Sequence, residues 1–370
     1  MRVAITGAHG FIGRNLQVRL QESPRFEVAV ITRDTTAADR RTTLTSVDVV
    51  VHLAGVNRPV HDQEFAEGNA GLTAAICDEL RSTTGAVPIV YASSTQAELD
   101  NAYGRSKRDA ENAVLQYAAD TGARAVILRL PNVFGKWSRP NYNSAVATFC
   151  HRIARGLPVS IHDPDAPLRL VYVDDVIDVI VGLLDDGVAT AGMIRVGPVH
   201  DTTVGAVAEA IRSFAASRET LDMPAVGTGF LRALYATYVS ALPLEAFAYA
   251  LRRHEDPRGV FAEILHTTDT GQFSFFTAHP GVTRGGHYHH TKSEKFLVVQ
   301  GVARFGFRHL LTSEHHTVVV RGSESRVVET VPGWVHDITN IGTDELIVLL
   351  WANEVFDPRR PDTIASRVTE

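Results

Sequence analysis

Cysteine is scarce in this chain, and long apolar runs are missing. Among 370 residues only Cys77 and Cys150 are cysteines, and neither belongs to a CxxC pair or a Cys/His finger. Both lie in apolar segments predicted to be helical, so we expect buried, reduced thiols and no disulfide. No apolar run approaches the ~18 residues that a membrane-spanning helix needs. The N-terminal MRVAITGAHGFIG also lacks a signal-peptide core and cleavage site, which predicts a cytoplasmic protein without a membrane partner.

An excess of positive charge is also missing. The formal net charge is −6, so the sequence gives no reason to expect nucleic acid or an anionic membrane as a partner. With 45% hydrophobic and 21% charged residues, the composition is that of an ordinary globular protein. A chain of 370 residues exceeds the size at which one core usually stops growing, and this length predicts two domains.

Up to about residue 240, short β-branched runs alternate with amphipathic segments. Such alternation predicts an α/β fold with a doubly wound parallel sheet of the Rossmann type. The predicted strands are residues 2–6, 27–31, 47–53, 87–92 and 125–129. The predicted helices are residues 14–22, 70–83 and 106–121.

The pattern changes between residues 243 and 256. Beyond it, short strand-like segments follow one another without helices, at residues 272–278, 295–299, 303–307, 316–320, 325–330 and 345–352. This succession predicts a small all-β barrel or sandwich. We therefore expect a nucleotide-binding domain at residues 1–245 and an all-β domain at residues 250–370, which holds ten of the 16 histidines.

The first predicted strand–helix turn is the segment TGAHGFIG. Gly7, Gly10 and Gly13 form a GxxGxxG pattern there, and glycine is needed where the backbone turns tightly against a pyrophosphate at a helix N-terminus. A lone glycine triplet is a weak signal, but a position after the first strand is the context that a dinucleotide site requires. We expect these glycines, with Phe11 and Ile12, to bind the cofactor.

Residues after the second and third strands refine the cofactor prediction. Dinucleotide folds that prefer NAD usually carry an acid after the second strand, whereas Arg33 suits the 2′-phosphate of NADP(H). A solvated loop arginine is the alternative interpretation. Leu53 and Ala54, at the end of the third strand, and Asn69, at the start of the next helix, are predicted to line the same cofactor.

The segment YGRSK supplies a chemical signature. Tyr103 and Lys107 lie four residues apart, on one face of a predicted helix. The lysine cation lowers the pKa of the tyrosine and holds the nicotinamide ribose, so the phenol can protonate a carbonyl oxygen as hydride arrives. Ser93 and Ser94, upstream in YASSTQA, offer hydroxyls that would polarise that carbonyl.

A second group of residues that could carry chemistry lies in the predicted all-β domain. His287, His289 and Glu294 follow Gly281 at close intervals, and His336 lies in a later segment, VPGWVHDITN. Three imidazoles and a carboxylate that converge inside a barrel form a site suited to Zn, Mn, Fe or Ni. Histidines kept for packing without a metal are the alternative.

The neighbours of these ligands leave some choices open. His290 could replace His289 as a ligand, because the two are adjacent. Tyr288, Lys292 and Lys295 are acid/base candidates, although we expect the two lysines to be solvated at the surface.

These motifs resemble those of two known families. The glycine turn, YASSTQA, YGRSK, RLPNVFG and VYVDDV resemble extended short-chain dehydrogenases/reductases over residues 1 to about 240. The family's acting hydroxyl corresponds to Ser94, which implies a catalytic group of Ser94, Tyr103 and Lys107. The spacing from Gly281 to Gly301, with VPGWVHDITN, resembles the two cupin motifs and implies a metal-binding cupin barrel.

The fusion of these two parts is itself informative. Together with RLPNVFGKW, ATFCHRIARGLP and GGHYHHTKSEKFLVVQG, it resembles the capsular-polysaccharide assembling reductases of UDP-N-acetyl-L-fucosamine synthesis over nearly the whole chain. This resemblance implies NADPH-dependent reduction of the C4 ketone of a UDP-amino-sugar, a UDP-2-acetamido-2,6-dideoxy-hexos-4-ulose, to the L-talo sugar nucleotide. It also implies prior epimerisation of the keto sugar in the cupin domain, at C3, with zinc as the expected metal, and a homodimer.

Two other functions fit some of the same residues. An NAD-dependent sugar-nucleotide 4-epimerase or dehydratase would use the same Ser/Tyr/Lys group, but it would recycle its cofactor, whereas a reductase consumes NADPH. A non-enzymatic NADP(H)-binding redox sensor would have no need of the Tyr103/Lys107 pair.

Overall fold

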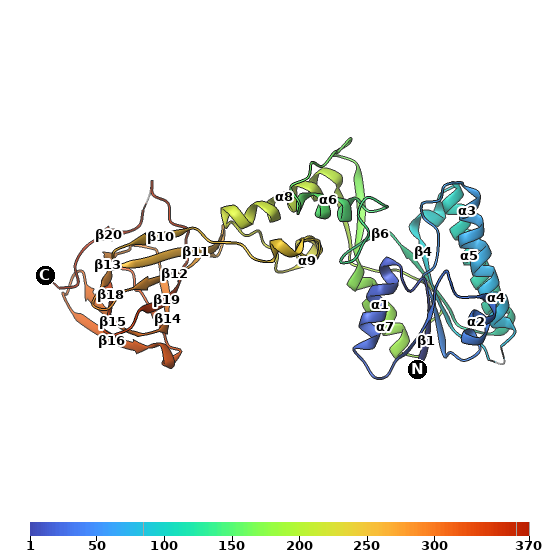
Figure 1. Ribbon diagram of the computed structural model, residues 1–370, viewed down its shortest axis with the longest axis horizontal. Coiled ribbons are helices and arrows are strands. Elements are labelled where there is room, and N and C mark those ends of the chain that lie inside the picture. Colours follow the sequence, from blue (N-terminus) through green and yellow to red (C-terminus); the bar gives the residue numbers. More distant parts are fainter. Residues whose placement is uncertain (84, 360, 370) are drawn as a thin grey trace. The chain divides into compact units, whose positions relative to one another are not determined.

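The computed structural model describes residues 1–83, 85–359 and 361–369 (Figure 1). The chain divides into two compact units. The front unit consists of residues 1–212 and 228–243, and the rear unit consists of residues 213–227 and 244–370. No helix among the described residues has the length and apolar character required to cross a membrane.

The front unit is built on a parallel sheet of six strands. Its spatial order is β2-β1-β3-β4-β5-β8, and every neighbouring pair is parallel. The strands are β1 (Arg2–Thr6), β2 (Glu27–Ile31), β3 (Val49–His52), β4 (Ile89–Ser94), β5 (Ala125–Leu130) and β8 (Gly192–Ile194). The four residues of β3 are all buried, as expected of a central strand with helices on both faces. The predicted Rossmann-type sheet is therefore confirmed.

Helices cover both faces of this sheet. On one face lie α1 (Phe11–Gln21) and α7 (Val173–Asp185), which pack against each other, and on the other lie α2 (Ala37–Leu44), α4 (Leu72–Arg81) and α5 (Ala102–Thr121) (Figure 1). Apolar side chains of the sheet and of the second face form a buried core, which includes Val50, Ile89, Ile76 and Val114. A short helix, α3 (Gln63–Phe65), runs into a π-helical turn at Ala66–Gly71 before α4 begins.

A smaller group of elements completes the front unit and leads to the rear one. Strands β6 (Asn132–Phe134), β7 (Pro167–Tyr172) and β9 (Val199–Thr203) form a separate three-stranded sheet. The remaining helices are α6 (Ala145–Ile153), α8 (Val204–Thr220) and α9 (Gly229–Ser240). Cys77 and Cys150 lie in α4 and α6 as buried free thiols, in agreement with the prediction.

The rear unit consists of antiparallel sheets. One has the order β10-β11-β12-β19-β14-β17 and the other β16-β15-β18-β13-β20. Their strands are β10 (Arg253–Asp256), β11 (Gly259–Thr267), β12 (Gly271–Ala278), β13 (Thr283–Tyr288), β14 (Glu294–Gln300), β15 (Val302–His309), β16 (His315–Arg321), β17 (Val327–Glu329), β18 (Trp334–Asn340), β19 (Leu346–Ala352) and β20 (Ile364–Ala365). Buried residues of both sheets, among them Phe296, Phe305 and Val348, share one core. This arrangement confirms the all-β architecture expected of a cupin-type barrel.

Residues 213–227 belong with the rear unit, which periodicity did not indicate. Within that segment the Leu221 carbonyl accepts the His266 N–H at 2.8 Å, and the Met223 N–H donates to the His266 carbonyl at 2.8 Å. These bonds attach the segment after α8 to β11. From Leu244 onward the chain belongs to the rear unit.

Candidate functional site

The glycine turn joins β1 to α1, as the motif requires. Gly7 has a φ of +65°, and a Cβ there would lie 2.7 Å from the Ala54 nitrogen, so only glycine fits this approach. Gly10 is the N-cap of α1 and has no side chain to cap the helix, and Gly13 packs on the Gly7 carbonyl. The first N–H groups of α1 therefore face a glycine-lined space without a side-chain acceptor, which fits a pyrophosphate.

The other predicted cofactor residues have different environments. Phe11 and Ile12 open α1 and are half-buried, and the N–H groups of Leu53 and Ala54 each donate to the Thr6 hydroxyl at 3.2 Å. Arg33 is exposed in the turn after β2. Within the described part of the chain it has no ion-pair partner, so its guanidinium is available to a phosphate.

The Asn69 side chain makes hydrogen bonds to the loop after β3 and to α5. Its amide nitrogen donates to the Val56 carbonyl at 2.9 Å and to the Ser106 hydroxyl at 3.0 Å, and its amide oxygen accepts the Val56 N–H at 2.8 Å. These bonds hold the loop after β3 against α5. Asn69 thus fixes the loop that follows Leu53 and Ala54.

Tyr103 and Lys107 lie in the first turns of α5. The Asn101 side chain caps this helix by accepting the Gly104 N–H at 2.7 Å, so the helix starts one turn earlier than predicted. A Cβ on Gly104 would lie 2.4 Å from the carbonyl oxygens of Gln96 and Leu99. Glycine therefore lets α5 approach the turn that follows Ser94, and this approach brings Ser94 to Tyr103.

The structure separates the roles of the two serines. Ser93 is buried, and its hydroxyl donates to the Glu111 carboxylate. Ser94 is only half-buried, and its hydroxyl accepts the Gln96 N–H at 3.1 Å. Burial raises the pKa of the Tyr103 phenol, and the nearby Ser94 hydroxyl acts in the opposite direction. Ser94, not Ser93, is thus the hydroxyl that can share a carbonyl oxygen with Tyr103.

Lys107 is a buried cation beside these hydroxyls. Its ammonium donates to the Ala92 carbonyl at 2.8 Å and lies 4.4 Å from the centre of the Tyr91 ring. Desolvation lowers the pKa of Lys107 to about 7, while the Glu111 carboxylate acts to raise it. Lys107 thus lies deep in the site, where a ribose hydroxyl and a phenolate could both reach its charge.

Glu111 and Arg129 form a support that motif reasoning missed. Arg129, in β5, donates two hydrogen bonds to the buried Glu111 carboxylate at 2.9 and 2.6 Å. Glu111 lies four residues after Lys107 on α5, so the pair ties α5 to the sheet. The helical i, i+4 spacing from Lys107 was the one signal that could have indicated it.

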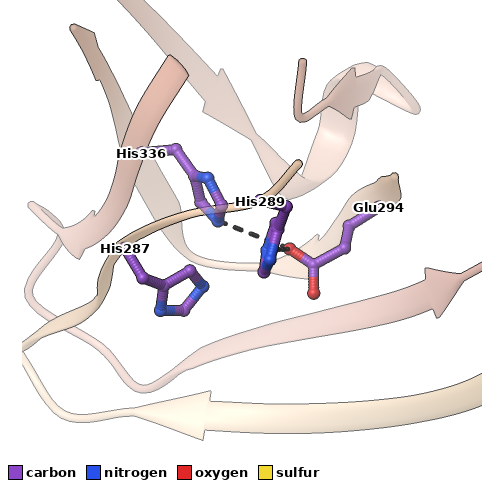
Figure 2. A group of neighbouring side chains, drawn as sticks. All are labelled: His287, His289, Glu294 and His336. Carbon is purple, nitrogen blue, oxygen red and sulfur yellow. Dashed lines mark hydrogen bonds and ion pairs between the residues drawn. The ribbon is translucent and has the colours of Figure 1, made fainter. Parts of the chain in front are cut away.

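In the rear unit the four predicted metal ligands converge. One ligand atom from each of His287, His289, Glu294 and His336 can be chosen so that all four lie within 4.8 Å of one another. His287 lies in β13, His289 follows it, Glu294 opens β14 and His336 lies in β18. Figure 2 shows the four side chains pointing toward a common space.

The ionisable groups of this buried cluster shift one another's pKa values. Nε2 of His289 and Nε2 of His336 each lie 3.3 Å from Oε2 of Glu294. Burial would raise the pKa of Glu294, but these histidine contacts and the Lys292 ammonium hold it well below its usual range. Desolvation and the neighbouring His336 lower the pKa of His287 to about 4, so that imidazole is neutral at pH 7.

A divalent cation fits this donor set. Nδ1 of His289 faces the Asp362 backbone carbonyl, which can only accept, so this nitrogen carries the proton. In a neutral ring the lone pair is then on Nε2, facing a carboxylate oxygen. Nδ1 of His336 is buried without a hydrogen-bond partner among the described residues, and its Nε2 faces the same Glu294 oxygen. A divalent cation between these nitrogens and the carboxylate would satisfy all of them.

The same geometry shows which of the other candidate residues lie near the cluster. His290 is exposed and packs its ring against Tyr288, outside the cluster, so His289 is the residue brought to the other ligands. Lys295 is exposed and pairs with Glu329. The expectation that Lys292 is solvated was wrong: its side chain is 12% exposed, because its ammonium lies 3.1 Å from Oε1 of Glu294.

The rear unit also has an open pocket lined by residues of both sheets. It lies between their edge strands β16 and β17 and measures about 480 Å³. Phe307, His316 and Trp334 line it from one sheet, and Val328 lines it from the other. Phe307 is the cross-strand partner of His336, so the wall of the cavity adjoins the ligand cluster.

Comparison with known proteins agrees with this two-part architecture. Residues 3–197 match the NAD dependent epimerase/dehydratase family, and residues 254–364 match the Polysaccharide biosynthesis C-terminal domain. The chain is 52% identical to UDP-2-acetamido-2,6-beta-L-arabino-hexul-4-ose reductase of Pseudomonas aeruginosa, over the full length of both chains.

Solved structures show the same relationship. The capsular polysaccharide assembling protein CapF of Staphylococcus aureus superposes with a TM-score of 0.94, at 40% identity, and each chain covers all of the other. A UDP-glucuronic acid 4-epimerase of Bacillus cereus in complex with NAD shares the fold of the front part, with a TM-score of 0.56 at 18% identity. That match covers 65% of this chain and 96% of the epimerase. The chain therefore belongs to the NAD dependent epimerase/dehydratase family and, within it, to the two-part proteins that include CapF and the P. aeruginosa reductase.

Proposed function

We propose that this protein uses NADPH to reduce the C4 ketone of a UDP-2-acetamido-2,6-dideoxy-hexos-4-ulose to the L-talo sugar nucleotide. The full-length identity of 52% to a UDP-2-acetamido-2,6-beta-L-arabino-hexul-4-ose reductase supports the substrate class. We further propose that the product is a precursor of UDP-N-acetyl-L-fucosamine for surface polysaccharide. The enzyme would act in the cytoplasm as a homodimer.

The observation that carries the proposal is the group of Ser94, Tyr103 and Lys107. Bound NADPH would supply the hydride. The chain supplies the proton from the Tyr103 phenol, and the nearby Ser94 hydroxyl adds a second donor to the same carbonyl oxygen. Lys107, whose ammonium is fixed by the Ala92 carbonyl, would stabilise the phenolate after proton transfer and hold the nicotinamide ribose.

The front unit would hold NADPH at the glycine turn. Gly7, Gly10 and Gly13, with Phe11, Ile12, Leu53 and Ala54, would line the cofactor. Arg33 would contact the 2′-phosphate, because its exposed guanidinium follows β2, where NAD-selective folds place an acid. Contact with the 2′-phosphate, which NADH lacks, would make the enzyme prefer NADPH to NADH.

For the rear unit we propose a zinc-dependent epimerisation of the keto sugar at C3, before reduction. A ketone at C4 makes the C3 proton acidic, and zinc held by His287, His289, Glu294 and His336 would supply positive charge to stabilise the resulting anion. The cavity bounded by Phe307 and Trp334 is large enough to accept a sugar. Lys292, whose ammonium lies 3.1 Å from Glu294, is a candidate group for proton transfer.

The decisive test is an NMR analysis of the product made from a 4-keto UDP-sugar with NADPH. We expect one NADPH oxidised per sugar reduced and an L-talo product. Interconversion of sugars without net NADPH consumption would instead establish a 4-epimerase or dehydratase. NADPH binding with no turnover of any 4-keto UDP-sugar would favour a redox sensor.

A further inference from the structure

We propose that Asp362 is a positioning residue for the rear metal site, and that the C-terminal segment at residues 362–368 preorganises that site. The inference rests on the proposed metal ligation by His289 and Glu294. Asp362 touches no ligand-donor atom of the cluster that would face the metal. It acts on the site through the far nitrogen of one ligand and through the loop between two of them.

The first contact fixes the tautomer of a ligand. Nδ1 of His289 donates to the backbone carbonyl of Asp362, and a carbonyl has no proton to give in return. The Nε2 lone pair of His289 is therefore directed at the cluster in the neutral ring. Outer partners of this kind orient ligating histidines and raise their basicity.

The second contact fixes the loop between His289 and Glu294. The Asp362 carboxylate accepts the backbone N–H groups of His290 at 2.9 Å, Thr291 at 2.7 Å and Lys292 at 2.9 Å. It also accepts the Thr291 hydroxyl at 3.1 Å. Three successive N–H groups directed at one carboxylate form an anion nest, which holds the loop in one conformation.

The segment that carries Asp362 is itself anchored to the barrel. In β20, Ile364 and Ala365 pair with Tyr288 and His287 of β13, so the segment lies directly beside a ligand strand. Farther along, the Arg308 guanidinium donates to the Arg367 carbonyl at 2.9 Å and 3.1 Å. Val368 is buried. These contacts give Asp362 a fixed position from which to restrain the loop.

The separation of His289 and Glu294 in the sequence makes metal binding depend on the loop between them. His289 and Glu294 are five residues apart, and only the conformation of the loop between them brings Nε2 to 3.3 Å from Oε2. If the nest is lost, the loop gains freedom that must be removed again when the metal binds. The loss of an outer-shell partner typically weakens metal affinity roughly 10- to 100-fold.

The test compares three full-length variants with the parent protein, after removal of metal with a chelator. Asp362→Ala removes the nest acceptor, and Asp362→Asn keeps the size of the side chain while removing its charge. Asp357→Asn is the matched control, because it removes one negative charge from the same tail, where Asp357 accepts the Arg359 N–H at 2.8 Å and has no other hydrogen-bond partner among the described residues. Zinc affinity is measured by competition with a chromophoric chelator, and the absorption spectrum of the Co²⁺-loaded protein reports on the geometry of coordination.

We expect Asp362→Ala to bind Zn²⁺ roughly 10- to 100-fold more weakly and to alter the Co²⁺ spectrum. Asp362→Asn should show a smaller loss, and Asp357→Asn should match the parent. Thermal unfolding of the metal-free proteins, followed by circular dichroism, separates a fold defect from a site defect. Parental affinity and spectrum in both Asp362 variants would overturn the positioning role alone, whereas a parent protein that binds no Zn²⁺ would overturn the metal site itself.

Discussion

The two candidate sites differ in the kind of polar group that they leave open. In the front unit, the Lys107 ammonium donates to the Ala92 carbonyl, but the first N–H groups of α1 have no side-chain acceptor. In the rear unit, Nδ1 of His336 is buried without a hydrogen-bond partner among the described residues, and Nε2 of His336 and Nε2 of His289 each lie 3.3 Å from one oxygen of Glu294. The front site thus offers donors that fit an anionic cofactor. The rear site offers nitrogens and a carboxylate that fit a cation.

The largest expected effect separates the chemistry of the front site from its framework. Tyr103→Phe removes the phenolic proton and leaves the ring against Phe65, so we expect kcat for 4-keto reduction to fall roughly 10²- to 10⁴-fold. NADPH binding, followed by fluorescence, and zinc content should remain at parental levels. A variant that still reduces the sugar at the parental rate would remove Tyr103 from the mechanism.

The matching change in the rear site should remove the metal. His336→Ala leaves three ligands of four, and its cost should exceed the roughly 10- to 100-fold loss caused by an outer-shell change. Metal content after dialysis, measured by elemental analysis, should fall to near zero. His290→Ala is the control, because this exposed neighbour lies outside the cluster, and it should retain the metal. The reverse result for these two variants would show that the ligand set is wrongly assigned.

A smaller effect should change the cofactor preference of the front site. Arg33→Ala should lower kcat/KM for NADPH by roughly ten- to a hundredfold, the cost of one hydrogen bond to a charged group, and leave NADH almost unchanged. Arg41, an exposed arginine in the last turn of α2, provides the control substitution Arg41→Ala. If the ratio of the two kcat/KM values is the same in Arg33→Ala and in the parent, then Arg33 does not read the 2′-phosphate.

The smallest effect follows from the pKa of Lys107. Desolvation lowers the pKa of Lys107 to about 7 in the free protein, and the anionic cofactor should raise it again on binding. Binding then takes up a proton, so NADPH affinity should fall as pH rises above about 7, by at most about tenfold per pH unit. Titration of NADPH binding between pH 6 and 9 measures this slope, and Lys107→Met should abolish it. A parental slope in that variant would assign the proton to another group.

The comparison also shows what the sequence could predict. The glycine turn and the Tyr103/Lys107 pair depend on local spacing, since one strand–helix turn and one helix face define them. The candidate metal ligands could be identified for a related reason, because His287, His289 and Glu294 lie close together in the sequence, near the end of β13, in the loop after it and at the start of β14. Local geometry fixed these positions, and they converge in the structure as predicted.

Contacts between residues that are far apart in the sequence could not be predicted from local spacing. Asp362 reaches Lys292 across 70 residues, and the Arg129 side chain reaches Glu111 from a different element. Lys292 was misjudged for the same reason, since its burial depends on Glu294 and on the loop that Asp362 holds.

The central claim is that the rear site exchanges a proton next to the ketone and that the front site reduces the ketone, each without the residues of the other. The most direct measurement incubates the 4-keto UDP-sugar in deuterated water with each of three proteins, and NMR then follows deuterium incorporation at C3 and reduction at C4. With NADPH present, the parent should yield a deuterated, reduced product. Tyr103→Phe should incorporate deuterium without reduction, and His336→Ala should lose incorporation while it still oxidises NADPH with any keto sugar that the front site accepts. Undiminished deuterium incorporation by a metal-free His336→Ala would contradict the account.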